Sequence, residues 1–198
     1  MRFRVALAND IRGSALVEFA VALPLLVVFI VGIYDFSGAF NQKQKLEHAA
    51  QEGAIVAGAQ PMNDIDPTTL TPPGPDSLQP VVNVIFNTLA AQNVLPLANQ
   101  GACKVPVAGT HGANPLQWNY TIPGCSGDAS DLPLAISIDR GVVENVVTLP
   151  PTTIVGTQVV VSYPYHWRFN SVIQLLVPGA SYAAVTNVRE TATVHNQM

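Results

Sequence analysis

The chain has 198 residues, of which 48% are hydrophobic and only 11% charged, a composition that is apolar for a soluble protein of this size. The formal net charge is −4 and no basic run follows residue 45, so the sequence lacks the clustered Lys and Arg of a nucleic-acid-binding protein. We therefore expect no nucleic-acid partner, and we expect part of the chain to lie in a membrane.

A membrane-spanning helix is predicted near the N-terminus, over residues 14–35. Residues 19–34 carry no charged side chain, and Glu18 is the only charged residue from Ala15 to Tyr34. At about 1.5 Å per residue these positions cover the ~30 Å hydrocarbon core of a bilayer. Three arginines precede the run against one aspartate: Arg2, Arg4, Arg12 and Asp10. This asymmetry predicts a cytoplasmic N-terminus, with everything after about Asn41 outside the cytoplasm.

Three interpretations of the apolar run compete. A cleaved secretory signal would be cut after Ser37-Gly38-Ala39, although the run is longer than the usual apolar region of roughly 7 to 15 residues. A plain signal anchor would tolerate Glu18 near the headgroups, because a carboxylate costs about 2.5 to 3.5 kcal/mol at the bilayer centre and less near the interface. A cut after Gly13 would instead make Glu18 the fifth residue of a new N-terminus.

The order of residues around Gly13 supports the third interpretation. A short basic leader, a glycine, four residues, the pair Glu18-Phe19 and an apolar helix follow one another. This arrangement resembles the processing site of type IV prepilin-like proteins, and the Glu-aromatic pair is similar to that of the Flp/Tad pilus branch. The apolar helix with Pro24, and LEHAAQEGAIVAGAQ at 46–60, resemble TadE-like minor pseudopilins. The segments VVVSYPYHW and NVRETATVHN resemble the terminal strands of that family more loosely.

The resemblance implies a non-enzymatic role in assembling a Tad-type pilus. From the residues themselves we expect no cofactor and no metal site. It implies that a prepilin peptidase removes the leader, residues 1–13, at a processing site formed by Gly13, Ser14, Glu18 and Phe19. The implied partners are this peptidase, other pilins and pseudopilins, inner-membrane pilus assembly proteins and membrane lipid. The chain would cross the bacterial inner membrane once, with its C-terminal head in the periplasm.

Under this interpretation Glu18 has a physical role. Cleavage creates an α-ammonium on Ser14, and within an assembly the Glu18 carboxylate pairs with the ammonium of a neighbouring subunit, where the alternative is an unpaired charge in lipid. Removing residues 1–13 takes away three Arg and one Asp, so the net charge changes from −4 to −6.

The helix is predicted to extend beyond the membrane through residues 36–60, because apolar and small residues recur there at helical spacing. Two lines of small residues lie at i+4 spacing: Ala49, Gly53 and Ala57, and beside them Ala50, Ala54 and Gly58. Such lines let another surface approach closely. They pack either on a partner subunit, as assembly residues together with Glu18 and Pro24, or on this chain's own sheet, and the two interpretations are compatible.

Pro61 is expected to end this helix, and a Pro-rich linker is predicted over 61–80. Asp76 or Ser77 is expected to cap a second, shorter helix that runs to about Gln92. Its predicted core face comprises Val81, Val82, Ile85, Phe86 and Leu89.

The head, residues 81–198, is predicted to be α+β, with an antiparallel sheet of about four strands docked on the long helix. Strand-like runs rich in β-branched residues occur at 134–139, 142–149, 157–165 and 183–194, and 117–122 alternates like a strand. Residues 169–176 fit a short helix or an apolar loop. Cys103 and Cys125 lack metal-ligand spacing, so a disulfide is expected, which stabilises a loop of this length by roughly 3 kcal/mol.

Candidate metal ligands are few. His48 and Glu52 have the i, i+4 spacing of two ligands on one metal but lack a third, which favours a solvated helix face. Oxygen ligands suited to calcium occur in two places where turn chemistry explains them equally well: Asn63, Asp64 and Asp66, and Asp128 and Asp131.

The alternative function is a signal-anchored or secreted extracytoplasmic binding domain or hydrolase. It requires either the histidines His111, His166 and His195 or a cluster of aromatic residues to converge on a pocket, and no nucleophile motif precedes any of the histidines. The aromatic cluster comprises Tyr163, Tyr165, His166, Trp167 and Phe169. Its alternation fits an interface, and fits better a strand with one face in the core.

Overall fold

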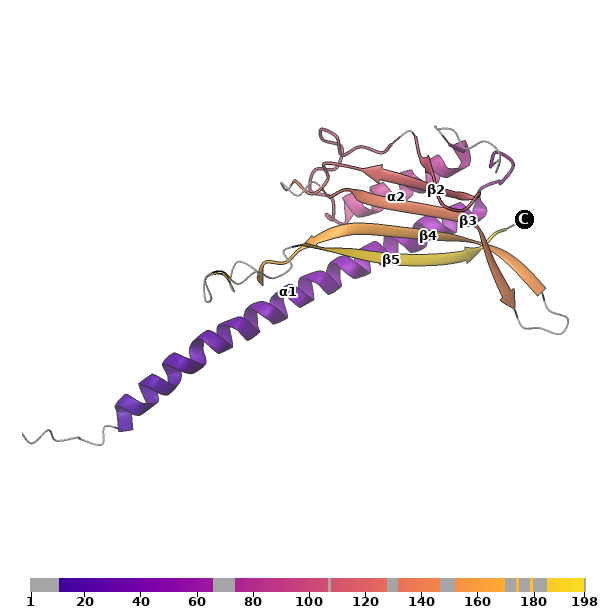
Figure 1. The fold of residues 1–198 in the computed structure, drawn as a ribbon. Helices are drawn as coiled ribbons and strands as arrows, with labels where there is room; N and C mark the ends of the chain where they lie inside the picture. Colours follow the sequence, from indigo (N-terminus) through magenta and orange to yellow (C-terminus); the bar gives the residue numbers. More distant parts are fainter. Residues whose placement is uncertain are drawn as a thin grey trace, which may run out of the picture. The chain divides into compact units, whose positions relative to one another are not determined.

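The structure is a computed structural model that describes residues 11–65, 74–106, 108–127, 132–146, 152–169, 174, 179 and 185–197. In these residues, two α-helices and a five-stranded antiparallel sheet give the α+β class that the sequence predicts (Figure 1). The chain divides into two compact units, Met1–Gly38 with Trp167–Ala184, called here the N-terminal unit, and Ala39–His166 with Val185–Met198, called the head unit.

The long helix α1 spans Ile11–Ala59 and contributes to both units. Its only internal proline is Pro24, and it stops one residue before the dipeptide Gln60-Pro61, because the residue before a proline is disfavoured in helical conformation. The prediction that the helix continues well beyond the apolar run is therefore confirmed. The compact unit that holds the sheet begins at Ala39, earlier than the predicted start of the head at residue 81.

The sheet is a simple meander in the order β1-β2-β3-β4-β5, with every neighbouring pair antiparallel. The strands are β1 (Thr110–His111), β2 (Gln117–Ile122), β3 (Leu134–Val146), β4 (Thr152–His166) and β5 (Val185–His195). The sheet thus has one strand more than the predicted four, although β1 has only two residues.

The predicted strands 134–139 and 142–149 belong to one continuous strand as far as Val146, and residues 147–149 lie outside the described part of the chain. The register of β3 against β4 shifts between Asp139 and Val142, which is the signature of a bulge. At this bulge the Asp139 carboxylate accepts the backbone N–H of Gly141 at 2.9 Å. The sequence predicts two separate strands on either side of Asp139-Arg140-Gly141. In the structure these three residues form a bulge within one strand.

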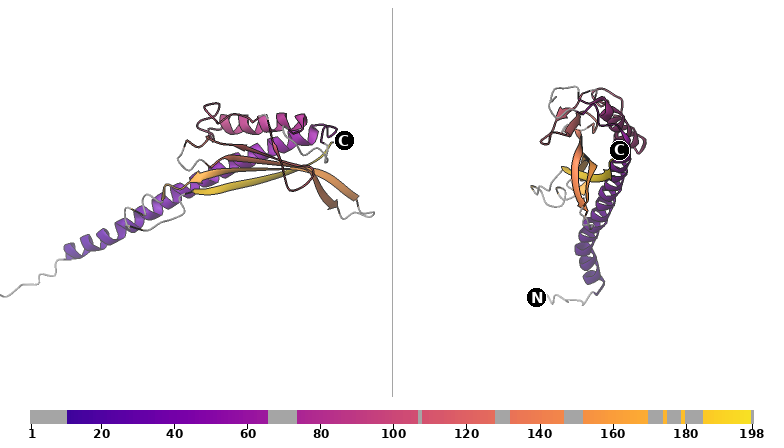
Figure 2. Two further views of the ribbon diagram at one scale, coloured as in Figure 1. Left: turned by 45° about the horizontal axis from the view of Figure 1, so that its top comes forward. Right: turned by 90° about the vertical axis from the view of Figure 1, so that its right-hand side faces the viewer.

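The helix α2 (Gln79–Ala91) lies beside the C-terminal part of α1, and both cover the same face of the sheet (Figure 2). Its buried residues are those of the predicted core face: Val81, Val82, Ile85, Phe86 and Leu89. The predicted cap is wrong. A 3₁₀ turn, η1 (Asp76–Leu78), precedes α2, and the Asp64 carboxylate accepts the backbone N–H of Ser77 at 2.7 Å. No residue at the start of η1 caps it with its own side chain. Asp64, 13 positions upstream, instead accepts a backbone N–H at the N-terminal end of η1.

The sheet turns an apolar face toward the two helices. Trp118, Tyr120 and Ile122 alternate on β2 with half-buried or exposed polar residues, as expected for an antiparallel sheet with one solvated face. On β4, Tyr163 is 4% exposed and belongs to the same hydrophobic core. The aromatic alternation near the end of β4 is thus explained there by a strand with one face in the core.

Polar contacts also connect α1 to the other elements of the head unit. Gln42 Nε2 donates to the carbonyl of Pro164 at 3.0 Å, and Lys43 pairs with Glu190 at 3.6 Å. Lys45 Nζ donates at 2.9 Å to the carbonyl of Gln92, the C-cap of α2, where a cation complements the helix dipole.

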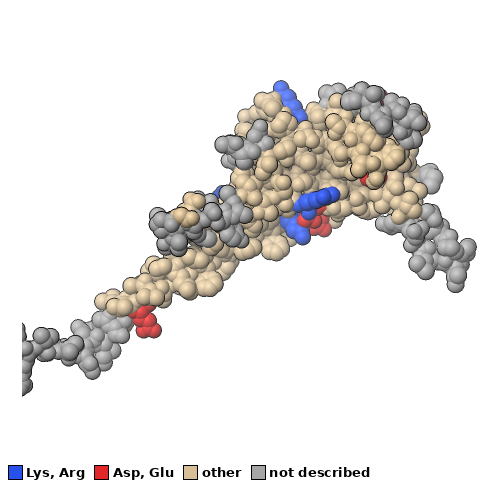
Figure 3. Space-filling model, in the orientation of Figure 1, with Lys and Arg blue, Asp and Glu red and all other residues tan. Residues whose placement is uncertain are grey.

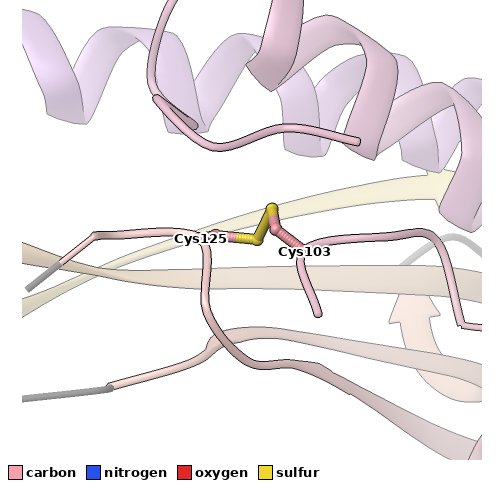
Figure 4. Close-up of a disulfide and its surroundings, with 2 residues drawn as sticks. All are labelled: Cys103 and Cys125. Carbon is pink, nitrogen blue, oxygen red and sulfur yellow. A yellow bond between two sulfur atoms is a disulfide. The ribbon is translucent and has the colours of Figure 1, made fainter. Parts of the chain in front are cut away.

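Cys103 and Cys125 form the predicted disulfide, with 4.8 Å between their Cα atoms (Figure 4). Both cysteines are fully buried in the core of the head unit. The bridge joins the loop after α2 to the loop after β2, across 22 positions of sequence.

Candidate functional site

The N-terminal part of α1 presents an apolar surface that the described residues leave uncovered. Its best 18-residue window has a mean hydropathy of 2.7, and none of that window is buried. The exposed side chains lie on all sides of the helix rather than along one stripe. A helix that is apolar all round suits a membrane span better than a soluble surface. Figure 3 shows this stretch as an uncharged surface, with acidic atoms near its N-terminal end.

Glu18 and Phe19 lie near the start of this surface, and both side chains are exposed. Gly13 and Ser14 lie in the first described turn of α1, and Ser14 precedes Glu18 by about one helical turn. Pro24 lies inside the helix and has no N–H to donate to the carbonyl four residues earlier. The four expected processing residues thus lie within seven positions of one helix, next to the apolar surface.

Comparison with known families gives a match in this same region. A family model described as TadE-like protein matches residues 13–54, from the glycine of the expected cut into the buried half of α1. The segment is therefore similar to TadE-like proteins. The matched segment covers 42 of the 198 residues and includes neither α2 nor any strand. No curated protein and no solved structure matches the chain.

The two lines of small residues belong to the core of the head unit. Ala49, Ala50, Ala54 and Ala57 are fully buried. A Cβ added at Gly53 would lie 2.5 Å from Ile85 of α2 and 3.6 Å from Val159 of β4. The small residues were expected to pack on a partner subunit or on this chain's own sheet. In the structure they pack on elements of the same chain, α2 and β4. Because this face is already covered, the exposed apolar surface of α1 is the better candidate for contacts between subunits.

Arg140 is a buried residue of the head unit that the sequence pattern does not indicate as a functional residue. Its side chain is 0% exposed, and its guanidinium donates to the carbonyls of Pro61 at 3.0 Å and Gln60 at 2.7 Å. Burial lowers the pKa of Arg140, and the nearby Asp64 carboxylate opposes this effect. The only sequence signal was a charged residue interrupting a β-branched run at the position of the bulge.

A second contact that the sequence did not indicate lies within the N-terminal unit. Asp35, on α1, is 1% exposed and accepts the backbone N–H of Phe169 at 2.6 Å. The next residue, Phe36, meets Trp167 edge to face, with 5.3 Å between ring centroids. These pairs are more than 130 positions apart in sequence, so no local pattern could reveal them.

The candidate metal ligands are not gathered in the part of the chain that the structure describes. No group of three or more His, Cys, Asp or Glu side chains suited to a metal occurs there. His48 pairs with Glu52 at 3.9 Å and contacts Gln92 at 3.2 Å, as on a solvated helix face. Asp64 is engaged with Ser77, whereas Asp66, Asp128 and Asp131 lie outside the described residues.

The histidines do not converge. His166 pairs with Val185 at one end of β5, and His195 is the last residue of β5, so about 30 Å separates them along the strand. His111 lies on β1 at the far edge of the sheet. A shallow hollow beside the bulge of β3 contains one carboxylate, Asp139, which is already bonded to Asn114 at 2.8 Å and to Gly141. This arrangement offers no support for a hydrolase.

Proposed function

We propose that the protein is a membrane-anchored minor pseudopilin that takes part in the assembly of a Tad-type pilus. The observation that carries the proposal is the exposed, all-round apolar helix surface that begins directly after Gly13-Ser14, in a segment that the TadE-like family model matches from Gly13 onward. TadE-like proteins are structural components of pili, so this role requires no catalytic site.

The proposal includes processing by a prepilin peptidase after Gly13. Mature chains would then start at Ser14, with the head unit outside the cytoplasm and residues 14–35 in the inner membrane. The buried disulfide fits this orientation, because such bridges persist in oxidising compartments such as the periplasm.

Glu18 is the residue that we assign to contact between subunits. It is the only charged residue among positions 15–34, and its side chain is exposed on α1. In lipid an exposed carboxylate requires a partner, and the α-ammonium that cleavage would create on Ser14 of a neighbouring subunit supplies one. The other partners we propose are pilins and pseudopilins and the inner-membrane assembly proteins.

The experiment that tests this function is complementation of a strain in which the gene has been deleted. The wild-type chain should restore surface pili. Glu18→Gln should still reach the membrane but lower the number of pili by about tenfold or more, since removing one member of a charge pair in a low-dielectric site is strongly destabilising.

The matched control is Glu52→Gln, an equally small change on the same helix at a solvated position. It should restore pili fully. Normal piliation of the deletion strain would contradict the pilus function, whereas normal piliation with Glu18→Gln would contradict only the role of Glu18.

A further inference from the structure

In the N-terminal unit, two residues of α1, Asp35 and Phe36, contact two residues that follow β4, Phe169 and Trp167, and this pair of contacts is called the clasp. Asp35 accepts the N–H of Phe169 at 2.6 Å, and the ring of Phe36 contacts Trp167 edge to face at an interplanar angle of 68°. The Asp35 carboxylate is 1% exposed although it belongs to a helix that is otherwise uncovered nearby. Burying a carboxylate is unfavourable unless it is hydrogen-bonded. The hydrogen bond from Phe169 therefore offsets the cost of burying Asp35, and it holds the segment after β4 on this turn of the helix.

The clasp has a defined position along the membrane span. Residues 19–34 form an uncharged run, and Asp35 is the first charged residue after it. In the proposed anchor, α1 therefore leaves the hydrocarbon core at Asp35 and Phe36. Trp167 and Phe169 contact these two positions directly, so Arg168, which lies between them in sequence, is held near the same level.

The side chains presented there are of the kinds that favour a membrane–water interface. Trp167 is half-buried and Arg168 is exposed. Tryptophan is enriched at the headgroup level, because its ring combines an apolar body with an N–H group that hydrogen-bonds to water or lipid headgroups. Arginine extends its charged group to lipid phosphates, which its planar guanidinium binds in bidentate fashion.

We propose that Trp167 and Arg168 form a second membrane contact at the level of the lipid headgroups, fastened to α1 by Asp35 and Phe36. This inference rests on the proposed membrane anchoring. The chain then touches the bilayer surface through two segments far apart in sequence, which fixes the orientation of residues 167–169 at the point where α1 leaves the lipid.

The two tryptophans of the chain supply a built-in test, because Trp118 is buried in the head core and Trp167 lies in the clasp. The full chain is reconstituted into vesicles of phosphatidylethanolamine and phosphatidylglycerol that carry a nitroxide either just below the headgroups or near the chain ends. In Trp118→Phe, whose fluorescence comes from Trp167 alone, the shallow nitroxide should quench roughly half of the emission and the deep nitroxide much less.

The reciprocal variant, Trp167→Phe, is the control, and its remaining Trp118 emission should be quenched by neither lipid. Should Trp118→Phe fail to fold, the difference in quenching between wild type and Trp167→Phe measures the same quantity in an intact head. Asp35→Ala should release the clasp and lower the shallow quenching of Trp167, whereas Asp139→Ala, in the head unit, should not.

The outcomes separate the two proposals. Vesicle-bound protein whose Trp167 is quenched by neither nitroxide overturns the headgroup contact and leaves the anchor intact, as would occur if another protein subunit covered this site. Stronger quenching by the deep nitroxide also overturns it. Protein that does not bind vesicles at all contradicts the membrane anchor and, with it, this inference.

Discussion

Arg140 Nη2 donates a 2.7 Å hydrogen bond to the carbonyl oxygen of Gln60, the residue that follows the last turn of α1. The last carbonyls of a helix have no intrahelical donors, and a cation near them also complements the helix dipole. The bulge of β3 places Arg140 at this position, since the register shift after Asp139 includes it. A local irregularity in a strand thus supplies hydrogen-bond donors at the C-terminal end of α1.

We expect Arg140→Met to destabilise the head unit by about 2 kcal/mol, because two hydrogen bonds from a charged donor are lost and two carbonyls lose their partners. Thermal unfolding of the detergent-solubilised chain, followed by circular dichroism, measures this change. Arg189→Met is the matched control, because Arg189 is exposed on β5. Equal unfolding temperatures for the Arg140→Met variant and the wild type would contradict the capping role.

Gly53→Ala tests whether the small residues of α1 pack within one chain. The added methyl would lie 2.5 Å from Ile85, so we expect the overpacking to outweigh the gain in helix propensity and to destabilise the head unit by about 1 to 2 kcal/mol. Gly32→Ala is the control, because nothing lies within 4 Å of its added Cβ.

A double-mutant cycle identifies the contact directly. The combined variant Gly53→Ala/Ile85→Ala should lose less stability than the sum of the two single changes, because the alanine at 85 removes the clash. Additive losses in the monomeric chain would show that Gly53 and Ile85 do not meet, and that the small-residue face serves another partner.

Tyr120 predicts an alkaline limit to the stability of the head. Burial is the larger cause, and the negative charge of Asp64 the smaller, that raises the pKa of the Tyr120 hydroxyl from 10.0 to about 12. The folded state therefore holds the phenolic proton more tightly than the unfolded state. The contribution of this tighter proton binding to the free energy of unfolding is fully present below pH 10. It is lost as the pH rises toward 12, a difference on the order of 3 kcal/mol.

Tyr120→Phe keeps the ring and removes the ionisable group, so the alkaline unfolding midpoint should move to higher pH. A pH titration monitored by circular dichroism, together with tyrosinate absorbance, measures it. Tyr34→Phe, at an exposed position of α1, should leave the midpoint unchanged. An unchanged midpoint in the Tyr120→Phe variant would show that this hydroxyl does not limit stability.

The helices and most strands were predictable because their residues repeat at regular spacing. The core face of α2 follows from Val81, Ile85 and Leu89 alone, and the end of α1 follows from Pro61. The continuity of β3 was not predictable, because Asp139-Arg140-Gly141 has the composition of a turn and only the pairing with β4 shows a bulge. The two residues of β1 are too few to form any pattern.

Three sets of tertiary contacts could not be predicted, because their partners do not follow from the local sequence. The cap at Ser77 comes from Asp64, whose local sequence fits an ordinary turn or a calcium ligand equally well. Asp35 looks, in sequence, like the first solvated residue after a membrane span, yet it is buried against Phe169. The lines at Ala49 and Gly53 indicated close packing correctly but not its partner, because small residues fit a helix of the same chain and a neighbouring subunit equally well.

The N-terminal sequence of the protein isolated from membranes of its native cell, with and without the prepilin peptidase, tests the proposed processing most directly. We expect a start at Ser14 when the peptidase is present and at Met1 when it is absent. A start at Phe40, or at Met1 in both strains, would contradict the proposed processing.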